Sequence, residues 1–207
     1  MGIAFKGQDN NGTLWAVWRI QETEEILWQM YLSHGVEAEP ALLKKKGAAL
    51  QQSCAARLAV AELTPLQGLT WSEEGVPRLA SGFLSLSHTA DWAAAAFHPN
   101  KRVGIDIEAP RAQLDRIAEK FSLPEERALF TPENKLHGLL GIWTAKEALF
   151  KAYGLGAVDF RKHLRLEPFH PESEGSIRAH VRLDNSPAEL HYHWIENCLC
   201  TRALLNP

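Results

Sequence analysis

The chain has 207 residues, 45% of them hydrophobic and 23% charged, with a formal net charge of -3 at pH 7. This composition is that of an ordinary folded protein, and the slight negative charge argues against nucleic-acid binding, which usually brings a basic excess. No apolar run approaches the roughly 20 residues that cross a bilayer, the N-terminus lacks a secretion signal, and the three cysteines have no disulfide or zinc spacing, so we expect a cytoplasmic protein without membrane contact.

The first hundred residues alternate between strand and helix patterns. Residues 83–88 alternate in polarity and are followed, after a turn, by the small side chains of 92–97, which is typical of a β-hairpin. Ser87 and His88 end its first strand and could bind a phosphate, although a lone histidine near a turn is more often simply hydrogen-bonded. A strand at 13–20, helices at 22–33 and 47–63, and the basic triplet 44–46, usually a solvated helix entry, complete this part.

A polar segment at 98–101 is the best boundary between two halves. We therefore expect an N-terminal α+β half at 1–100 and a C-terminal α+β half at 101–207. The second half begins with a strand at 103–108, and its later pattern turns from helices to strands. These are predicted as helices at 111–120, from Pro124 and around 143–153, then strands at 163–167, 176–183, 190–196 and 199–205.

The strand at 103–108 has an unusual face. Because side chains alternate across a sheet, Gly104, Asp106 and Glu108 share one side and three β-branched residues share the other. Two carboxylates so close raise each other's pKa unless a cation lies between them, and a glycine beside them would let a bulky ligand approach the backbone. An isolated Asp-x-Glu is more often a solvated acidic face, so this strand alone does not establish a site.

A second stretch, 143–154, makes a functional site at these carboxylates more plausible than a solvated acidic face. Its Ala, Leu, Glu and Lys content favours a helix that ends at Gly154. Trp143, Glu147 and Lys151 recur every four residues and so share one helix face. The simple interpretation is a surface ion pair between Glu147 and Lys151, which contributes about 0.3–0.5 kcal/mol. The alternative makes Glu147 a third oxygen ligand and Lys151 a phosphate-binding group.

Together, Gly104-Ile105-Asp106-Ile107-Glu108 and Trp143-Thr144-Ala145-Lys146-Glu147-Ala148-x-x-Lys151-x-x-Gly154 resemble the two signature motifs of the 4′-phosphopantetheinyl transferases. The upstream segment 83–89 is similar to that family's F-N-x-S-H-S element, and Gly75-Val76-Pro77 to its G-K-P turn, with Val76 in place of the usual lysine. The order and separations fit the longer, surfactin-type branch. The resemblance implies two similar halves related by a pseudo-two-fold axis, each an antiparallel sheet packed against helices, in a monomer.

The resemblance also implies an activity, the transfer of 4′-phosphopantetheine from coenzyme A to a serine of an apo acyl or peptidyl carrier protein, with release of 3′,5′-ADP. Asp106, Glu108 and Glu147 match the ligands of Mg²⁺, for which Mn²⁺ can substitute. Asp106, Glu147 and Lys151 match the catalytic set, with Glu147 or a water that it holds as the base. The residues expected to bind coenzyme A are Ser87, His88, Lys44, Lys46, Arg57 and Lys151.

Two alternatives stay open. One is a relative that binds coenzyme A or a carrier protein without catalysis, and the other is a magnesium-dependent hydrolase of nucleotide diphosphates. Because carrier proteins are typically acidic, an active transferase should present a basic docking surface, for which Arg161, Lys162 and Arg165 are candidates. His191 and His193 share a strand face, but no carboxylate or cysteine is placed to complete a ligand set, so we interpret them as surface residues.

Overall fold

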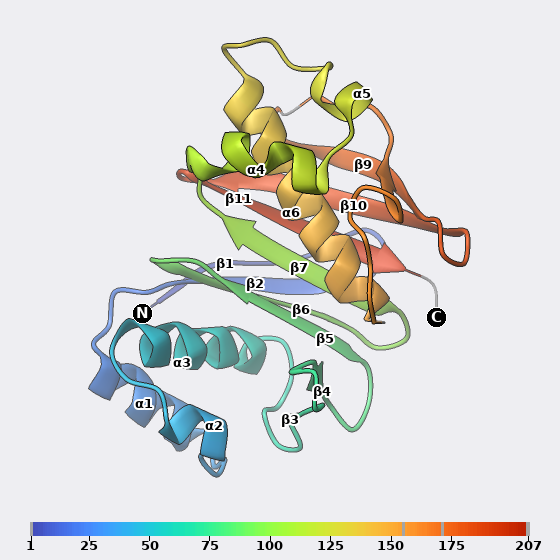
Figure 1. The fold of residues 1–207 in the computed structure, drawn as a ribbon. Helices are drawn as coiled ribbons and strands as arrows, with labels where there is room; N and C mark the ends of the chain where they lie inside the picture. Colours follow the sequence, from blue (N-terminus) through green and yellow to red (C-terminus); the bar gives the residue numbers. More distant parts are fainter. Residues whose placement is uncertain (1, 155, 171, 206–207) are drawn as a thin grey trace. The chain divides into compact units, whose positions relative to one another are not determined.

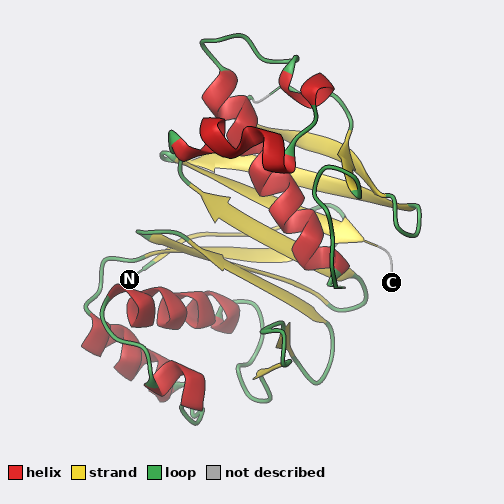
Figure 2. Cartoon of the chain, viewed as in Figure 1, coloured by secondary structure: helices red, strands yellow, loops and turns green. Residues whose placement is uncertain are grey.

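The computed structural model describes residues 2–154, 156–170 and 172–205. Its backbone contacts cluster into two compact units, Met1–Asn100 and Lys101–Pro207. Each unit combines an antiparallel sheet with helices (Figures 1 and 2), which confirms the predicted α+β class. Within the described residues, no helix has both the length and the apolar character that crossing a membrane requires.

The first unit is a four-stranded sheet with helices packed on it, and the strand order is β1-β2-β6-β5. All neighbouring strands of this sheet are antiparallel. A small separate sheet is formed by two very short strands. In chain order the elements are β1 (Ile3–Gln8), β2 (Leu14–Arg19), α1 (Glu24–Ser33), α2 (Pro40–Leu43), α3 (Ala48–Ala61), β3 (Thr70–Trp71), β4 (Pro77–Arg78), β5 (Phe83–His88) and β6 (Trp92–His98).

Small side chains let α3 lie close to this sheet. Strand β6 contributes Ala93 and Ala95 to the same buried cluster as Ala55 and Ala59 of the helix, and all four are fully or almost fully buried. Such packing brings backbone near backbone without leaving voids. The predicted hairpin is confirmed, because β5 pairs with β6 in an antiparallel register. Strand β1 and the two-residue strands β3 and β4 were not predicted, and α2 lies where only a break at Pro40 was expected.

The second unit is a five-stranded antiparallel sheet in the order β7-β11-β10-β9-β8. Its longest helix, α6, lies against the sheet, and α4 packs on that helix (Figure 1). Each predicted strand of this half is confirmed within a few residues. In chain order the elements are β7 (Arg102–Glu108), α4 (Gln113–Phe121), α5 (Pro124–Arg127), α6 (Lys135–Tyr153), β8 (Leu164–Leu166), β9 (Glu174–Val181), β10 (Ser186–Ile195) and β11 (Cys198–Leu205).

Helix α6 is the centre of this unit's core. Apolar residues cover most of its circumference, and Leu139, Ile142 and Leu149 are completely buried. A helix that is buried on most sides in this way is held by packing more than by its intrinsic propensity. The helix ends as predicted at Gly154, whose left-handed φ of 67° favours glycine.

Candidate active site

The candidate site is built where α6 crosses β7. At the crossing, a Cβ added to Gly104 would clash with the carbonyl oxygen of Ala148 and lie 2.7 Å from the backbone nitrogen of Ala152. The glycine is therefore needed for the helix to approach the strand. The expectation that this glycine leaves room for a ligand is wrong, because the backbone of α6 occupies that space.

Two residues further along β7, Asp106 faces the same side as Gly104 and is only 6% exposed. The ammonium of Lys151 donates hydrogen bonds to Asp106 Oδ1 at 2.7 Å and to the carbonyl oxygen of Ile105 at 3.0 Å. The lysine thus crosses from the helix to the strand, and this contact is what joins the two sequence motifs. A simple surface pair within the helix does not describe it, since the Asp106 side chain is 8% exposed and that of Lys151 is 26% exposed.

Glu147 lies one helical turn before Lys151 and is half-buried. Loss of solvation raises its pKa above the usual value, and the negative charges of Asp106 and Glu108 raise it further, whereas Lys151 and Arg111 oppose the rise. The three carboxylates are thus near enough for their charges to interact. The four predicted residues of the second unit, Asp106, Glu108, Glu147 and Lys151, are thus close enough to interact. Among them, the Glu147 carboxyl has a raised pKa.

Glu108 marks the edge of this cluster. Its carboxylate pairs with the guanidinium of Arg111 at 3.3 Å and accepts a hydrogen bond from the backbone N–H of Ala109 at 3.1 Å. Arg111 was not predicted as a site residue. Its position at i+3 from Glu108, just after the strand, was the signal available in the sequence.

The donor chemistry of this cluster fits a hard cation. Three carboxylates drawn from a strand and a helix are the oxygen donors that Mg²⁺ prefers, in a site that would also retain water and substrate phosphates. Among the described residues, no three His, Cys, Asp or Glu side chains are already arranged closely enough to hold an ion, and Lys151 supplies the positive charge beside Asp106. The metal role of Asp106, Glu108 and Glu147 stays a prediction.

The other predicted site residues belong to the first unit. Ser87 is buried within β5, and His88 is exposed at the end of that strand. Lys44 and Lys46 are exposed in the loop between α2 and α3. Their part in binding coenzyme A stays a prediction.

Arg57, also in the first unit, is 6% exposed, and its guanidinium is bound by other residues of the protein. Its guanidinium donates to both carboxylate oxygens of Glu39, at 3.0 and 2.6 Å, and to the carbonyl oxygen of Ser53 at 2.9 Å. It also stacks over the ring of Trp71, 4.7 Å from its centroid. Its role towards coenzyme A stays a prediction, and a phosphate there would have to replace Glu39.

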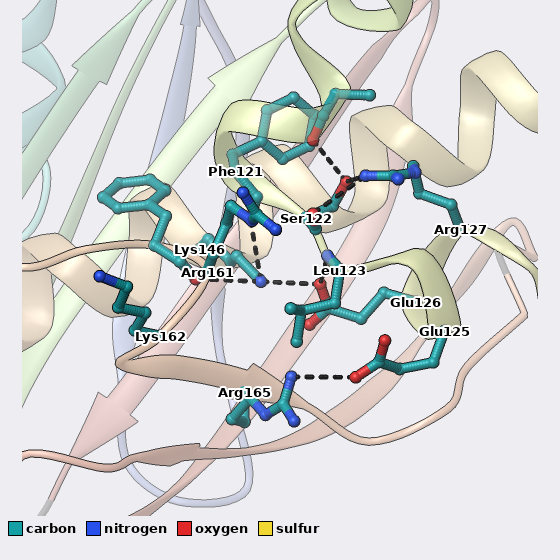
Figure 3. A network of polar contacts seen from close by, with 12 residues as sticks. Phe121, Ser122, Leu123, Glu125, Glu126, Arg127, Lys146, Arg161, Lys162 and Arg165 are labelled. Atoms are coloured by element: carbon teal, nitrogen blue, oxygen red, sulfur yellow. Dashed lines mark hydrogen bonds and ion pairs between the residues drawn. The ribbon is translucent and has the colours of Figure 1, made fainter.

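A second polar network, which connects α6 with α4 and α5, was missed by sequence reasoning (Figure 3). Lys146 is completely buried and forms an ion pair with Glu126 at 2.8 Å. The available signal was its position, because Lys146 recurs at helical spacing with the buried residues Ile142, Leu149 and Tyr153. A lysine in such an apolar stripe requires a buried partner.

The histidines of β10 are half-buried, so their interpretation as surface residues was only partly right. The Nδ1 atom of His193 lies 2.8 Å from Nη1 of the buried Arg202, and Nε2 of His191 lies 3.7 Å from Glu189. These contacts are internal to the sheet.

Comparison with known proteins agrees with this geometry. The sequence model of the 4′-phosphopantetheinyl transferase superfamily matches residues 102–202, which include β7 and α6. The second unit of the chain is therefore similar in sequence to the 4′-phosphopantetheinyl transferase superfamily. The superfamily resemblance noted in the sequence is thereby confirmed.

Three curated proteins that this chain resembles are named 4′-phosphopantetheinyl transferases. HetI of a Nostoc species is 31% identical over 113 residues, which are 52% of this chain and 45% of the relative. AcpT of Salmonella typhi is 36% identical over 100 residues, 44% of this chain and 52% of the relative. AcpT of Escherichia coli is 34% identical over 125 residues, 54% of this chain and 64% of the relative. The chain thus spans about half the length of the curated relatives it matches.

Proposed function

We propose that this protein is an enzyme that transfers the 4′-phosphopantetheine moiety of coenzyme A to a serine hydroxyl of an apo carrier protein and releases 3′,5′-ADP. The observation that carries the proposal is the meeting of the two motifs, in which Lys151 of α6 contacts Asp106 of β7 at 2.7 Å beside a Glu147 with a raised pKa. The names of the relatives support the same activity.

The chemistry requires one bond to form and one to break. The serine oxygen attacks the phosphorus that carries the pantetheine arm, and the bond from that phosphorus to the bridging oxygen of 3′,5′-ADP breaks. The serine proton passes to Glu147 or to a water that Glu147 holds. A carboxylate with a raised pKa is a better base than an ordinary one, because its pKa lies nearer the working pH.

Charge on the diphosphate must be neutralised during this transfer, since positioning and electrostatics provide most of the rate in phosphoryl transfer. Lys151 is placed to move its ammonium from Asp106 to a phosphate oxygen. Asp106, Glu108 and Glu147 would hold Mg²⁺, and a bound Mg²⁺ supplies further positive charge at the diphosphate.

The remaining parts of the proposal concern the first unit and the partner. Ser87 and His88 would contact the phosphates of coenzyme A, and the exposed Lys44 and Lys46 would meet its 3′-phosphate, with Arg57 as a further cation. We also propose the longer, surfactin-type branch of the superfamily, with its two similar halves, as a monomer in the cytoplasm.

One assay tests the proposal against its alternatives. The chain is incubated with coenzyme A, Mg²⁺ and an apo carrier protein, and the mass of the carrier protein is measured. A mass gain of one phosphopantetheine arm supports the transferase. Release of 3′,5′-ADP without a modified carrier indicates a hydrolase, and neither product indicates a binding protein; either result contradicts the proposal.

A further inference from the structure

Lys146 directly precedes Glu147 on α6, and no earlier step of the proposed reaction uses it. Its side chain is completely buried, and its ammonium has three acceptors in three separate segments (Figure 3). These are the carbonyl oxygen of Phe121 at 2.9 Å, Oε2 of Glu126 at 2.8 Å and the carbonyl oxygen of Phe160 at 3.1 Å. One side chain therefore joins the end of α4, the short helix α5 and the segment that follows α6.

The contact with Phe160 fixes a turn of defined structure, formed by residues 159–163 and called the 159–163 turn below. Oδ1 of Asp159 accepts hydrogen bonds from the backbone N–H groups of Arg161 at 2.9 Å and Lys162 at 3.0 Å. The N–H of His163 donates to the carbonyl oxygen of Asp159 at 2.8 Å. The turn is thus held in shape by its own bonds, as Asp typically does in turns.

Two contacts attach this turn to α6, and both are made by Phe160. Its carbonyl oxygen accepts from Lys146, and its ring packs against Phe150 and Trp143, with centroids 5.6 and 6.1 Å apart. Arg161 and Lys162 follow immediately and are exposed. The Phe160 anchor attaches these two positive charges to α6, and hence near Glu147, while the carbonyl oxygen of His163 accepts from the N–H of Arg182 at 2.8 Å and attaches the other end of the turn to the sheet.

Burying a lysine costs free energy, so packing alone does not explain its presence at this position. Burial disfavours the charged form and lowers the pKa of Lys146, although Glu126 opposes this. A buried ion pair can often be replaced by apolar side chains without loss of stability. A methionine would fill the same volume but could not bind three carbonyl and carboxylate oxygens at once, so what the ammonium adds is fixed geometry between segments.

We propose that Lys146 is a positioning residue that holds the 159–163 turn in place relative to Glu147, so that a protein substrate bound at Arg161 and Lys162 presents its serine to that carboxylate. This inference rests on the proposed transferase function. In this proposal Lys146 does not contact coenzyme A, because its ammonium is buried among protein oxygens.

The test separates positioning from stability with a charge-neutral double variant. Lys146→Met alone leaves the Glu126 carboxylate buried without its cation, whereas Lys146→Met/Glu126→Gln removes both charges and keeps an oxygen acceptor for the backbone N–H of Leu123, which Glu126 binds at 2.8 Å. Both lack the bond to Phe160. Lys135→Met, which removes an exposed lysine of the same helix together with its pair to Asp115, is the matched control.

Steady-state kinetics with each substrate varied in turn provides the first measurement. In the folded double variant we expect the KM for the carrier protein to rise about tenfold while the KM for coenzyme A changes less than about twofold. The docking turn loses its bond to Lys146, whereas none of the three acceptors of Lys146 is a residue proposed to bind coenzyme A. The control should keep both values. A folded double variant with the unchanged KM for the carrier, or with both KM values raised equally, would overturn the inference.

Hydrogen exchange provides a second measurement that does not depend on activity. The bonds inside the turn should open more often once the turn is released from α6, so the amides of Arg161, Lys162 and His163 should exchange at least about tenfold faster in the double variant than in the control. Equal protection in the two proteins would overturn the positioning role. If the unmodified chain transfers nothing, the proposed function fails, and the exchange result still decides whether Lys146 holds the turn.

Discussion

The two units of this chain use the same packing device with different chemistry. In the first unit α3 packs against β6 at Ala93 and Ala95, and in the second α6 packs against β7 at Gly104. Both crossings need small side chains on the strand. Only β7 follows its small residue with a buried acid, Asp106. A helix can therefore pack on a sheet of this kind without carboxylates, and we propose that the acids of the second unit are present for the chemistry.

Each of the two long helices, α3 and α6, carries a buried positively charged side chain. Arg57 of α3 pairs with Glu39, and Lys146 of α6 pairs with Glu126. The first pair keeps some exposure, with 18% of the Glu39 side chain accessible, whereas the second pair has a completely buried lysine and a glutamate side chain that is 8% exposed. The units thus differ in how completely the ion pair is removed from water, which makes them a natural pair for mutagenesis.

The largest expected effect is on catalysis. Glu147→Gln should reduce phosphopantetheine transfer by about 10²–10⁴-fold, which is the usual contribution of general base catalysis, while the protein stays folded because the side chain is only half-buried. Transfer is followed by mass spectrometry of the carrier. Glu119→Gln, at an exposed glutamate of α4, is the control and should keep full activity.

The next effect distinguishes the two buried ion pairs. Lys146→Met should lower the free energy of unfolding by about 3–5 kcal/mol, as removal of one partner of a buried pair generally does. Arg57→Met should lower it less, because water can reach the exposed part of Glu39. Urea denaturation of both variants measures the difference. A larger loss for Arg57→Met would contradict the ranking by burial.

The two helix crossings can be compared by substituting the small strand residue at each of them. Gly104→Ala introduces a Cβ into the backbone of α6 and should destabilise the protein by about 1–3 kcal/mol or more, as overpacking does. It should also reduce transfer, because α6 carries Glu147. Ala95→Gly removes a buried methyl group from β6 and should cost about 1 kcal/mol without affecting the chemistry. A neutral Gly104→Ala would mean that α6 does not approach β7 this closely.

A smaller effect should appear in the pH dependence of stability. The folded state raises the pKa of Glu147 above its ordinary 4.5, so it disfavours the charged carboxylate. The unmodified protein should match Glu147→Gln in stability below pH 4.5 and fall behind it as the pH rises through the raised value. Thermal unfolding at several pH values measures this, and a gap of the opposite sign would mean that the carboxylate is stabilised in the fold.

The smallest effect is expected at the surface of α6. Lys135 pairs with Asp115, and both side chains are about half exposed, at 48% and 56%. Lys135→Met should therefore change the free energy of unfolding by no more than about 0.5 kcal/mol. A loss comparable with that of Lys146→Met would show that burial does not separate the two lysines of this helix.

Periodicity was sufficient to find the main elements and the faces of the site. Strand alternation placed Asp106 and Glu108 on one side of β7, and helical spacing placed Glu147 and Lys151 on one side of α6. Alternation could not tell which side of β7 the helix covers, because β7 is buried on both faces although only one of its faces is apolar. Strands of two residues, such as β3, are too short for any period to register.

Contacts between segments that are distant in the chain could not be predicted from the sequence. Lys151 and Asp106 are 45 residues apart, and no local rule pairs them in preference to Lys151 and Glu147. Lys146 was overlooked because a lysine is usually assigned to the solvent, and its burial depends on acceptors supplied by three other segments. Arg57 was assigned to a ligand site because its partner Glu39 lies outside its helix.

The claim that the acids at the β7–α6 crossing perform the chemistry is tested most directly by one paired measurement. Unmodified protein and Glu147→Gln, shown by circular dichroism to be equally folded, are each given coenzyme A, Mg²⁺ and apo carrier protein. The account predicts that the carrier gains the mass of one phosphopantetheine arm with the first protein and none on the same time scale with the second. Equal modification by both proteins would contradict it.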